Sequence, residues 1–430
     1  MVANAIQQTM AFDRESTFGG GVADWDSLSA NGSVYRCYDV DVSKIQQGKI
    51  ENKNLKLRAG DNYAQVLGLK ANDFGFKAYL HGSAAGAAEG AQAAAIPQDE
   101  LLYNALGGYL RGYGAGIAAG TAANPTVEDA DGDNLAPYTF GFFFDDSAGV
   151  GYCRQIASIA EGVGSDTLTM STGHTLPFTP DAGGADRLYA CVEHWCDYDI
   201  LEDHTHASHT SLAFFFKGKH TEYSVELEGC AVGVEPGPIE QGSLVELRFA
   251  GKAASSDLTG ITQPDLTSTP AGIPGRVPGS GTATLCYLSV SSVDLAAQTF
   301  WGAIEPKFGA KKDPVQGPNG LEGIHGFGLT EDSYDAAGVD ITVPFDDAFI
   351  TAHEADTRYH LLVQIGNTPL NTVFVYYPML ELQSYERVSV GGRQGLKLMM
   401  RAIDRGIAQG TLTAAQWNRA QAPFVIGRVA

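Results

Sequence analysis

The feature that most constrains the fold is an approximate internal repeat, in which each half of the 430-residue chain closes with a hairpin, a loop and one more strand. In the first half, the hairpin Phe214–Leu227 is followed by the strand Leu244–Phe249. In the second half, Leu361–Leu382 is followed by Gly395–Met400. We therefore expect two copies of one β-unit, while two unrelated β-domains with similar hairpins would give the same pattern.

Most other segments alternate between apolar and polar side chains over short runs, which is the pattern of half-buried strands. One segment differs, because Pro97 precedes two acidic residues and the apolar side chains from Leu101 to Tyr109 share one helical face. The Gly- and Ala-rich stretch 112–133 is expected to be a long loop. The sequence thus predicts a mainly β protein with one short helix.

The length exceeds the roughly 250–300 residues at which one hydrophobic core usually stops growing, so two domains are expected. Hydrophobic residues make up 44% of the chain and charged residues only 18%, which is enough for two ordered cores. Ser, Thr, Pro and Gly dominate from Lys252 to Gly281, as in a linker. We predict an N-terminal arm at 1–29, a first domain at 30–255, a linker at 256–281, a second domain at 282–403 and a C-terminal extension at 404–430.

The charge balance is strongly acidic, with 50 Asp and Glu against 28 Lys and Arg and a formal net charge of −22. Such a field repels a nucleic-acid backbone, which disfavours a nucleic-acid clamp. It suits a surface past which DNA slides without binding, and it is equally typical of ordinary soluble proteins. Since the chain has neither an apolar run long enough to cross a membrane nor a secretory signal at residues 1–14, we expect synthesis in the cytoplasm and no membrane partner.

The one metal-like cluster of the sequence joins Cys191, His194 and Cys196 to the downstream residues His204, His206 and His209. The spacing of the two cysteines is not that of a common closed zinc site, and Cys191 and His194 would point to opposite faces of a strand. The six cysteines are scattered, so we expect reduced, packed thiols and no cofactor. A zinc site remains the alternative.

Signals for other chemistry are weak. Residues 128–134 place Asp and Gly at the alternation of a calcium loop but lack its distal bidentate Glu, so a solvated acidic loop is expected. No nucleophile elbow, zinc-protease helix, phosphate-binding loop or dinucleotide fingerprint stands in a strand-to-helix setting. We therefore predict a protein without a catalytic site.

The order of these segments resembles the major tail tube proteins of long-tailed bacteriophages, the siphophages. The segments that carry the resemblance are Glu15–Gly19, Tyr38–Val42, Lys53–Leu57, Phe74–Ser83, the helix at Glu100–Gly108, the hairpin at Phe214–Leu227 and the strand at Ser243–Phe249. The resemblance covers residues 1–255 well and residues 282–403 more loosely, through patterns and not through an invariant signature.

This resemblance implies two tail-tube-type β-barrel or β-sandwich domains with a short flanking helix, an extended arm and loops. Fused double members of the family form rings of three subunits, so it also implies a trimer with pseudo-sixfold symmetry. Such rings stack helically, and their lumen conducts DNA during ejection. The implied partners are further copies of the chain, the tape measure protein, the tail terminator and distal tail proteins, with DNA passing through unbound. The implied location is the tail of the virion.

Two local features fit that role. Glu222 and Glu226 share the polar face of an alternating strand, and on a lumen wall they would repel DNA phosphates within a screening distance of about 8 Å. A solvated outer face is the alternative for both. Lys217, Gly218 and Lys219 form a basic hairpin tip, which contacts carboxylates of an adjacent ring or simply caps the turn.

Two other classes share this composition. A carbohydrate-binding or depolymerising protein of a tail tip or spike would need clustered exposed aromatic side chains and a carboxylate pair. A capsid or decoration protein would have the same acidic, Gly-rich β composition. Negative-stain images distinguish the three classes as tubes or rings, discrete oligomers that bind glycans, or capsid-like sheets.

Overall fold

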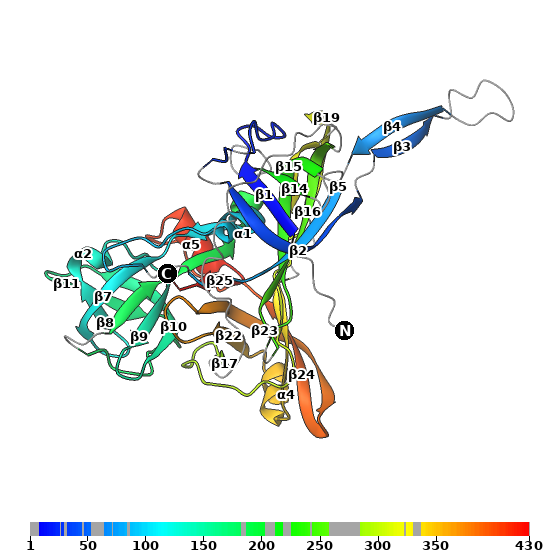
Figure 1. Cartoon of the computed structure of the whole chain (residues 1–430). Helices are drawn as coiled ribbons and strands as arrows, with labels where there is room; N and C mark the ends of the chain where they lie inside the picture. Colours follow the sequence, from blue (N-terminus) through cyan, green and yellow to red (C-terminus); the bar gives the residue numbers. More distant parts are fainter. Residues whose placement is uncertain are drawn as a thin grey trace.

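The computed structural model describes residues 8–429 except 26, 30–31, 45–46, 53–63, 71, 84–86, 182–185, 203–210, 218–224, 241–242, 258–283, 322–323 and 330–336. Its strands form two closed barrels, a nine-stranded sheet and two separate hairpins, with short helices between them (Figure 1). The prediction of a mainly β fold with barrel-type domains and short flanking helices is confirmed. The predicted linker at 256–281 lies outside the described residues beyond Asp257.

The first barrel has the strand order β1-β14-β15-β16-β5-β2 and draws on both ends of the first half. Its strands are β1 (Gln8–Arg14), β2 (Ser33–Lys44), β5 (Asn72–Tyr79), β14 (Leu212–Lys217), β15 (Val225–Pro236) and β16 (Glu246–Asp257). Alternate side chains point inward, and the aromatic rings of Phe76, Phe214 and Phe249 fill the interior. These contacts bury apolar surface and stabilise the closed barrel.

The predicted arm at 1–29 is only partly an arm. Residues 8–14 form β1, which pairs with both β2 and β14 and closes the first barrel. The segment that follows lies on the outer face of that barrel, where the Trp25 ring packs on Phe215 at a centroid distance of 5.7 Å. Glu15 anchors it, because its carboxylate accepts hydrogen bonds from the backbone N–H groups of Gly19 and Gly229.

The second barrel is inserted into the first half, between helix α1 (Pro97–Leu106) and β14. Its order is β10-β11-β8-β7-β12-β9. The strands are β7 (Tyr113–Gly120), β8 (Pro125–Glu128), β9 (Phe140–Asp145), β10 (Val150–Ala160), β11 (Ser165–Met170) and β12 (Arg187–Ala190), with the short helix α2 (Asp129–Gly132) after β8. The expected loop at 112–133 is therefore largely β7 and β8. The predicted first domain at 30–255 contains the second barrel and all of the first barrel except β1 and the last two residues of β16.

The second half contributes most of a nine-stranded sheet in the order β18-β21-β24-β23-β25-β13-β6, with β22 pairing to β23 and β17 to β22. The strands are β6 (Gly107–Leu110), β13 (Val192–Cys196), β17 (Thr284–Val290), β18 (Glu305–Lys307), β21 (Gly338–Pro344), β22 (Arg358–Ile365), β23 (Val373–Val390), β24 (Arg393–Ala402) and β25 (Val425–Arg428). In the described residues, the predicted second domain at 282–403 thus contributes its strands to this open sheet.

The remaining elements are two hairpins and three helices. The hairpins are β3 (Gln47–Asn52) with β4 (Ala64–Lys70), and β19 (Lys312–Leu321) with β20 (Ile324–Leu329). The helices are α3 (Tyr198–Glu202), α4 (Asp347–Glu354) and α5 (Ala414–Gln421). In Figure 1 the β3–β4 hairpin extends away from the body of the chain, whereas β19 lies beside β15.

The two halves share one strand order. The first unit runs β1-β14-β15-β16-β5-β2, and the second unit runs β17-β22-β23-β24-β21-β18. Along the chain, each unit has two strands, a separate hairpin, a third strand, a helix and three final strands. The first unit closes because β1 pairs with β2. In the described chain, the corresponding strands β17 and β18 of the second unit do not pair with each other, so that unit stays open. The internal repeat expected from the sequence is therefore present as a repeated fold.

Local irregularities repeat as well. In the first unit, one extra residue on β15 falls between the pairs Leu212↔Cys230 and Phe214↔Leu227. In the second unit, one extra residue on β23 falls between Tyr359↔Leu380 and Leu361↔Tyr377. A β-bulge is a specific feature of a fold, so its recurrence at the same place supports duplication of one unit.

The C-terminal residues join the two units. Strand β25 is hydrogen-bonded to β13 of the first half on one side and to β23 of the second on the other. Arg428 on this strand donates to the Asp99 carboxylate of α1 at 2.7 Å, and His194 lies 3.3 Å from the same carboxylate. Burial alone would raise the pKa of Asp99, but the His194 hydrogen bond and the Arg428 charge outweigh it and hold this pKa at about 2. The predicted extension at 404–430 is thus an integral part of the sheet.

We predict that Arg428→Leu lowers the free energy of unfolding by about 3–5 kcal/mol, because it leaves the buried Asp99 carboxylate without its cation. Urea denaturation of the variant measures the loss. The double variant Asp99→Asn/Arg428→Leu removes the charge together with its partner and keeps an oxygen for the Ile96 N–H, so it should recover part of the stability. An Arg428→Leu protein that stays within about 1 kcal/mol of the wild type would contradict this role.

Candidate functional site

The structure places one of the two predicted glutamates. Glu226 is half-buried on the outer face of the first barrel, where Trp25 donates a hydrogen bond of 2.8 Å from Nε1 to its Oε1. Burial raises the pKa of Glu226, and the Trp25 hydrogen bond opposes that shift. In the single chain, Glu226 therefore lies under the N-terminal segment, and Glu222 lies outside the described residues. Their lumen-facing role remains a prediction.

The basic hairpin tip is only partly described. Lys217 is the last residue of β14, and its backbone is paired with Thr9 of β1. Gly218 and Lys219 lie outside the described residues. The hairpin itself is confirmed, since β14 and β15 pair in antiparallel fashion. The inter-ring contact of its tip remains a prediction.

The described members of the cysteine–histidine cluster have different surroundings. Cys191 packs in a core with Phe140 and Phe374, whereas Cys196 packs in the separate core beneath α1 and α3. His194 turns to Asp99. These positions confirm that Cys191 and His194 do not share a face. The downstream residues His204, His206 and His209 lie outside the described residues.

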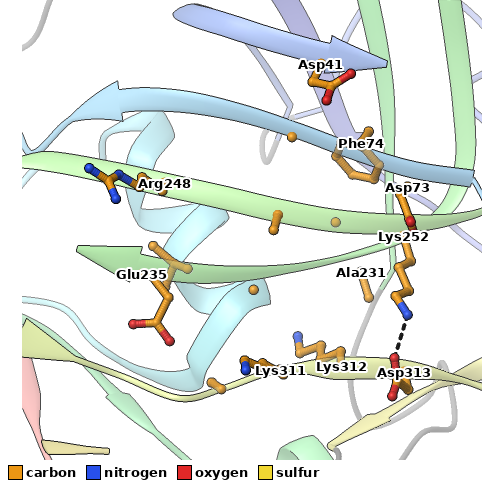
Figure 2. A pocket seen from close by; sticks show the side chains of 16 residues that line it. Asp41, Asp73, Phe74, Ala231, Glu235, Arg248, Lys252, Lys311, Lys312 and Asp313 are labelled. Carbon is orange, nitrogen blue, oxygen red and sulfur yellow. Dashed lines mark hydrogen bonds and ion pairs between the residues drawn. The ribbon is translucent and has the colours of Figure 1, made fainter. Parts of the chain in front are cut away.

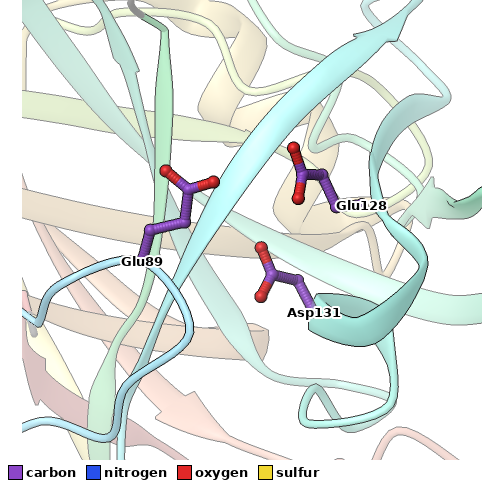
Figure 3. A group of neighbouring side chains, drawn as sticks. All are labelled: Glu89, Glu128 and Asp131. Carbon is purple, nitrogen blue, oxygen red and sulfur yellow. The ribbon is translucent and has the colours of Figure 1, made fainter.

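Among the described residues, three carboxylates come close enough to share a metal ion. Glu89, Glu128 and Asp131 each place one oxygen within 4.8 Å of the others (Figure 3). Such oxygens are the ligands that calcium takes. However, the Asp131 oxygens accept hydrogen bonds from the Tyr113 hydroxyl at 3.3 Å and the Gly116 N–H at 2.9 Å, and Arg187 pairs with Glu89. The fold itself thus provides partners for two of the three groups.

Two buried histidines lie where the second barrel packs on the sheet of the second unit. His174 accepts the Gln155 backbone N–H at Nδ1 (3.1 Å), so its Nε2 carries the proton and donates to the Tyr376 hydroxyl at 3.0 Å. The His360 ring lies 5.7 Å from the His174 ring. Burial lowers the pKa of His174 well below its usual value and that of His360 to about 4. Both histidines are therefore buried and neutral near pH 7.

We predict that acid weakens the folded state through these two residues. Because their folded pKa values are depressed, the unfolded chain binds protons first as the pH falls below about 6.5. At about pH 5 each histidine should therefore cost about 2 kcal/mol relative to about pH 7.5. Urea denaturation at the two pH values measures the difference, which should shrink by about 2 kcal/mol in His360→Gln. An unchanged pH dependence in that variant would contradict the assignment.

A groove lies at the seam between the two units (Figure 2). It has a volume of about 690 Å³ and runs between the outer face of the first barrel and residues 310–313. Small residues of β5, β15 and β16 form its floor. Charged side chains form its rim, where Lys252 of the first unit pairs with Asp313 of the second at 2.5 Å. The groove therefore lies where two parts of the chain contact each other.

Glu235 is the central polar group of this seam. Its carboxylate accepts hydrogen bonds from the backbone N–H groups of Phe308 at 2.8 Å and Gly309 at 2.7 Å. Burial raises the pKa of Glu235, and these two hydrogen bonds oppose the shift. Ile239 and Ile304 add a pair of backbone hydrogen bonds of 2.8 and 3.0 Å beside it. The segment that leads into β19 is thus held along β15 by main-chain contacts.

The β19–β20 hairpin continues this contact with apolar side chains. Ile324 and Phe327 pack on Ala231 and Ala254, which lie on the outer face of β15 and β16. The ring of Phe18 from the N-terminal segment lies 6.2 Å from the ring of Phe327. The second unit therefore covers the outer face of the first with its hairpin, which the sequence analysis did not anticipate.

Glu386 occupies on β23 the place that Glu235 occupies on β15. The bulges set the alignment: Ala253 pairs with Cys230 beside the first bulge, and Ala402 pairs with Leu380 beside the second, so Ala253 and Ala402 are equivalent. Arg248 lies five residues before Ala253 and pairs with Glu235. Lys397 lies five residues before Ala402 and pairs with Glu386. Unlike Glu235, Glu386 is exposed.

We predict that Glu235→Ala lowers the free energy of unfolding by about 1–3 kcal/mol, because two backbone N–H groups at the seam lose their acceptor. Glu386→Ala is the matched control and should stay within about 0.5 kcal/mol of the wild type in the isolated chain. Chemical denaturation of both variants tests this contrast. Equal effects of the two substitutions would show that Glu235 does not hold the seam.

No protein-family model matches the chain, and no curated protein matches it. Among the described residues, no helix is both long and apolar enough to cross a membrane.

Proposed function

We propose that the chain is a structural subunit of a bacteriophage tail tube, whose copies close into rings and stack around a channel that conducts DNA during ejection. The observation that carries this proposal is the seam between the two units. There the second unit binds the outer face of the first with a different surface of its own, namely the segment before β19 and the β19–β20 hairpin. A contact between two different surfaces of like units is heterologous, and it produces a closed ring or a filament when it is repeated.

The repeat supports a ring of three chains with pseudo-sixfold symmetry. Each chain supplies two units of the same strand order, already joined in one such heterologous contact. Three chains would then present six similar units around an axis. The inserted second barrel has no counterpart in the second unit, so we place it outside the repeating wall of the ring.

The charge of the chain supports passage of DNA without binding. A net charge of −22 gives a wall that repels phosphate groups, so that DNA moves past it without specific contacts. In this proposal the protein is located in the virion tail and has no catalytic role. Its neighbours there are the tape measure protein, the tail terminator and distal tail proteins.

A carbohydrate-binding spike protein is the runner-up, and the described surface gives it little support. Among the described residues, the exposed large hydrophobic side chains include two aromatic ones, Tyr79 and Phe345, which belong to different units. Recognition of sugar rings usually uses clustered aromatic faces. A capsid or decoration protein shares the β composition. Negative-stain electron microscopy distinguishes it from a tube protein, because it would form capsid-like sheets and not rings or tubes.

We predict that the purified wild-type protein forms rings or tubes with an axial channel when it is concentrated. Negative-stain electron microscopy shows the shape, and native mass spectrometry gives multiples of three chains of 45.5 kDa. Capsid-like sheets, discrete oligomers that bind glycans, or monomers at every concentration would each contradict the proposed function.

A further inference from the structure

We propose that the β3–β4 hairpin of one copy docks on the outer face of the β23–β24 ribbon of a second copy, beside Glu386. This inference rests on the proposed function, because it names the interface that would join chains in the ring. The partner is a second copy of this chain. The contact would repeat, between two chains, the contact that the structure shows between the two units of one chain.

The donor is assigned by its place in the repeat. The β3–β4 hairpin follows the second strand of the first unit and precedes its third strand, as β19–β20 does in the second unit. The register agrees, since Lys44 pairs with Asp73 at the end of β2 and Lys307 pairs with Gly338 at the end of β18. Each hairpin therefore leaves its unit at the same point.

The two equivalent hairpins differ in their surroundings. The β19–β20 hairpin lies on the first unit, where Ile324 and Phe327 pack on Ala231 and Ala254. The β3–β4 hairpin instead projects from the body of the chain (Figure 1). A two-stranded hairpin is marginally stable by itself in water. Among the described residues, each chain thus carries one hairpin that is docked on the other unit and one hairpin whose backbone extends away from the body of the chain.

The acceptor is assigned in the same way. On β15, the stretch around Glu235 is covered by the segment that leads into β19. On β23, the equivalent stretch is uncovered, and Gln383, Ser384 and Glu386 are exposed. Helix α4 does not cover this face, because its His353 contacts the ring of Tyr385, which lies on the other side of the ribbon. In the described chain, the acceptor surface on β15 is therefore covered by the second unit, whereas the equivalent surface on β23 is exposed.

The ribbon that carries the acceptor is built to extend into solvent. Gly391 and Gly392 have φ values of 56° and 78°, which are those of a tight two-residue hairpin turn. The turn lets β23 and β24 run beyond the sheet as a pair. A partner that lies along this ribbon would bury surface that is exposed in the single chain.

Two variants separate donor from acceptor. The first replaces residues 46–71 by a short Gly-rich turn, which the direct pairing of Lys44 with Asp73 allows, and it keeps the acceptor. The second is Glu386→Arg, which keeps the donor. Glu161→Arg is the control, because Glu161 is an exposed carboxylate beyond the end of β10 in the second barrel. Near-ultraviolet circular dichroism establishes that each variant is folded.

We expect the hairpin-less protein to stay monomeric, while Glu386→Arg needs about a 10- to 100-fold higher concentration for half-maximal assembly. Glu161→Arg should assemble like the wild type. A mixture of the two defective variants should give a dimer of one chain of each kind and nothing larger, since only one donor and one acceptor remain. Native mass spectrometry detects this dimer as the sum of one full-length chain of 45.5 kDa and one shortened chain.

The outcomes distinguish the two proposals. Wild-type protein that forms rings while both folded variants also form them normally would overturn this interface and leave the proposed function standing. A mixture that gives no mixed dimer, although the wild type assembles, would overturn it as well. Wild-type protein that never assembles would overturn the proposed function and this interface together.

Discussion

The contact on which the rest of the structure depends is the binding of the second unit to the outer face of the first. Glu235 is a half-covered carboxylate whose desolvation is unfavourable, and the N–H groups of Phe308 and Gly309 offset that cost only when the two units are joined. The surfaces that meet are different, one a strand face and the other a hairpin with its leading segment. A contact of this kind leaves one such surface unused at each end of the pair, which is the condition for growth into a ring.

The repeat could be predicted from the sequence because each unit ends in a hairpin of apolar strands, Phe214–Leu227 and Leu361–Leu382, that is followed by a loop and one more strand. The second barrel could not be predicted, since β7 consists mainly of Gly and Ala and lacks the β-branched side chains that signal a strand. Its Gly114 is required by packing: a Cβ there would lie 2.4 Å from the carbonyl oxygen of Ala88. That contact joins residues far apart in the chain, so the local pattern indicated a loop.

The candidate site shows the same limit. Alternation placed Glu226 correctly on the polar face of its strand, but it could not show that Trp25, which is 201 residues away, covers that carboxylate. Glu235 could not be recognised from its local sequence, because its partners at Phe308 and Gly309 come from the other unit. An alignment of the two repeats would have indicated Glu235, since Glu235 and Glu386 occupy equivalent positions opposite Arg248 and Lys397.

The most direct test of the central claim is an electron cryomicroscopy reconstruction of the wild-type assembly. It compares the contact between neighbouring chains with the contact between the two units of one chain. The account predicts that the two contacts superpose, with β3–β4 of one chain lying along β23–β24 of the next and main-chain N–H groups pointing at Glu386. A reconstruction in which neighbouring chains meet through other surfaces, with β3–β4 free and the β23–β24 ribbon bare, would contradict it.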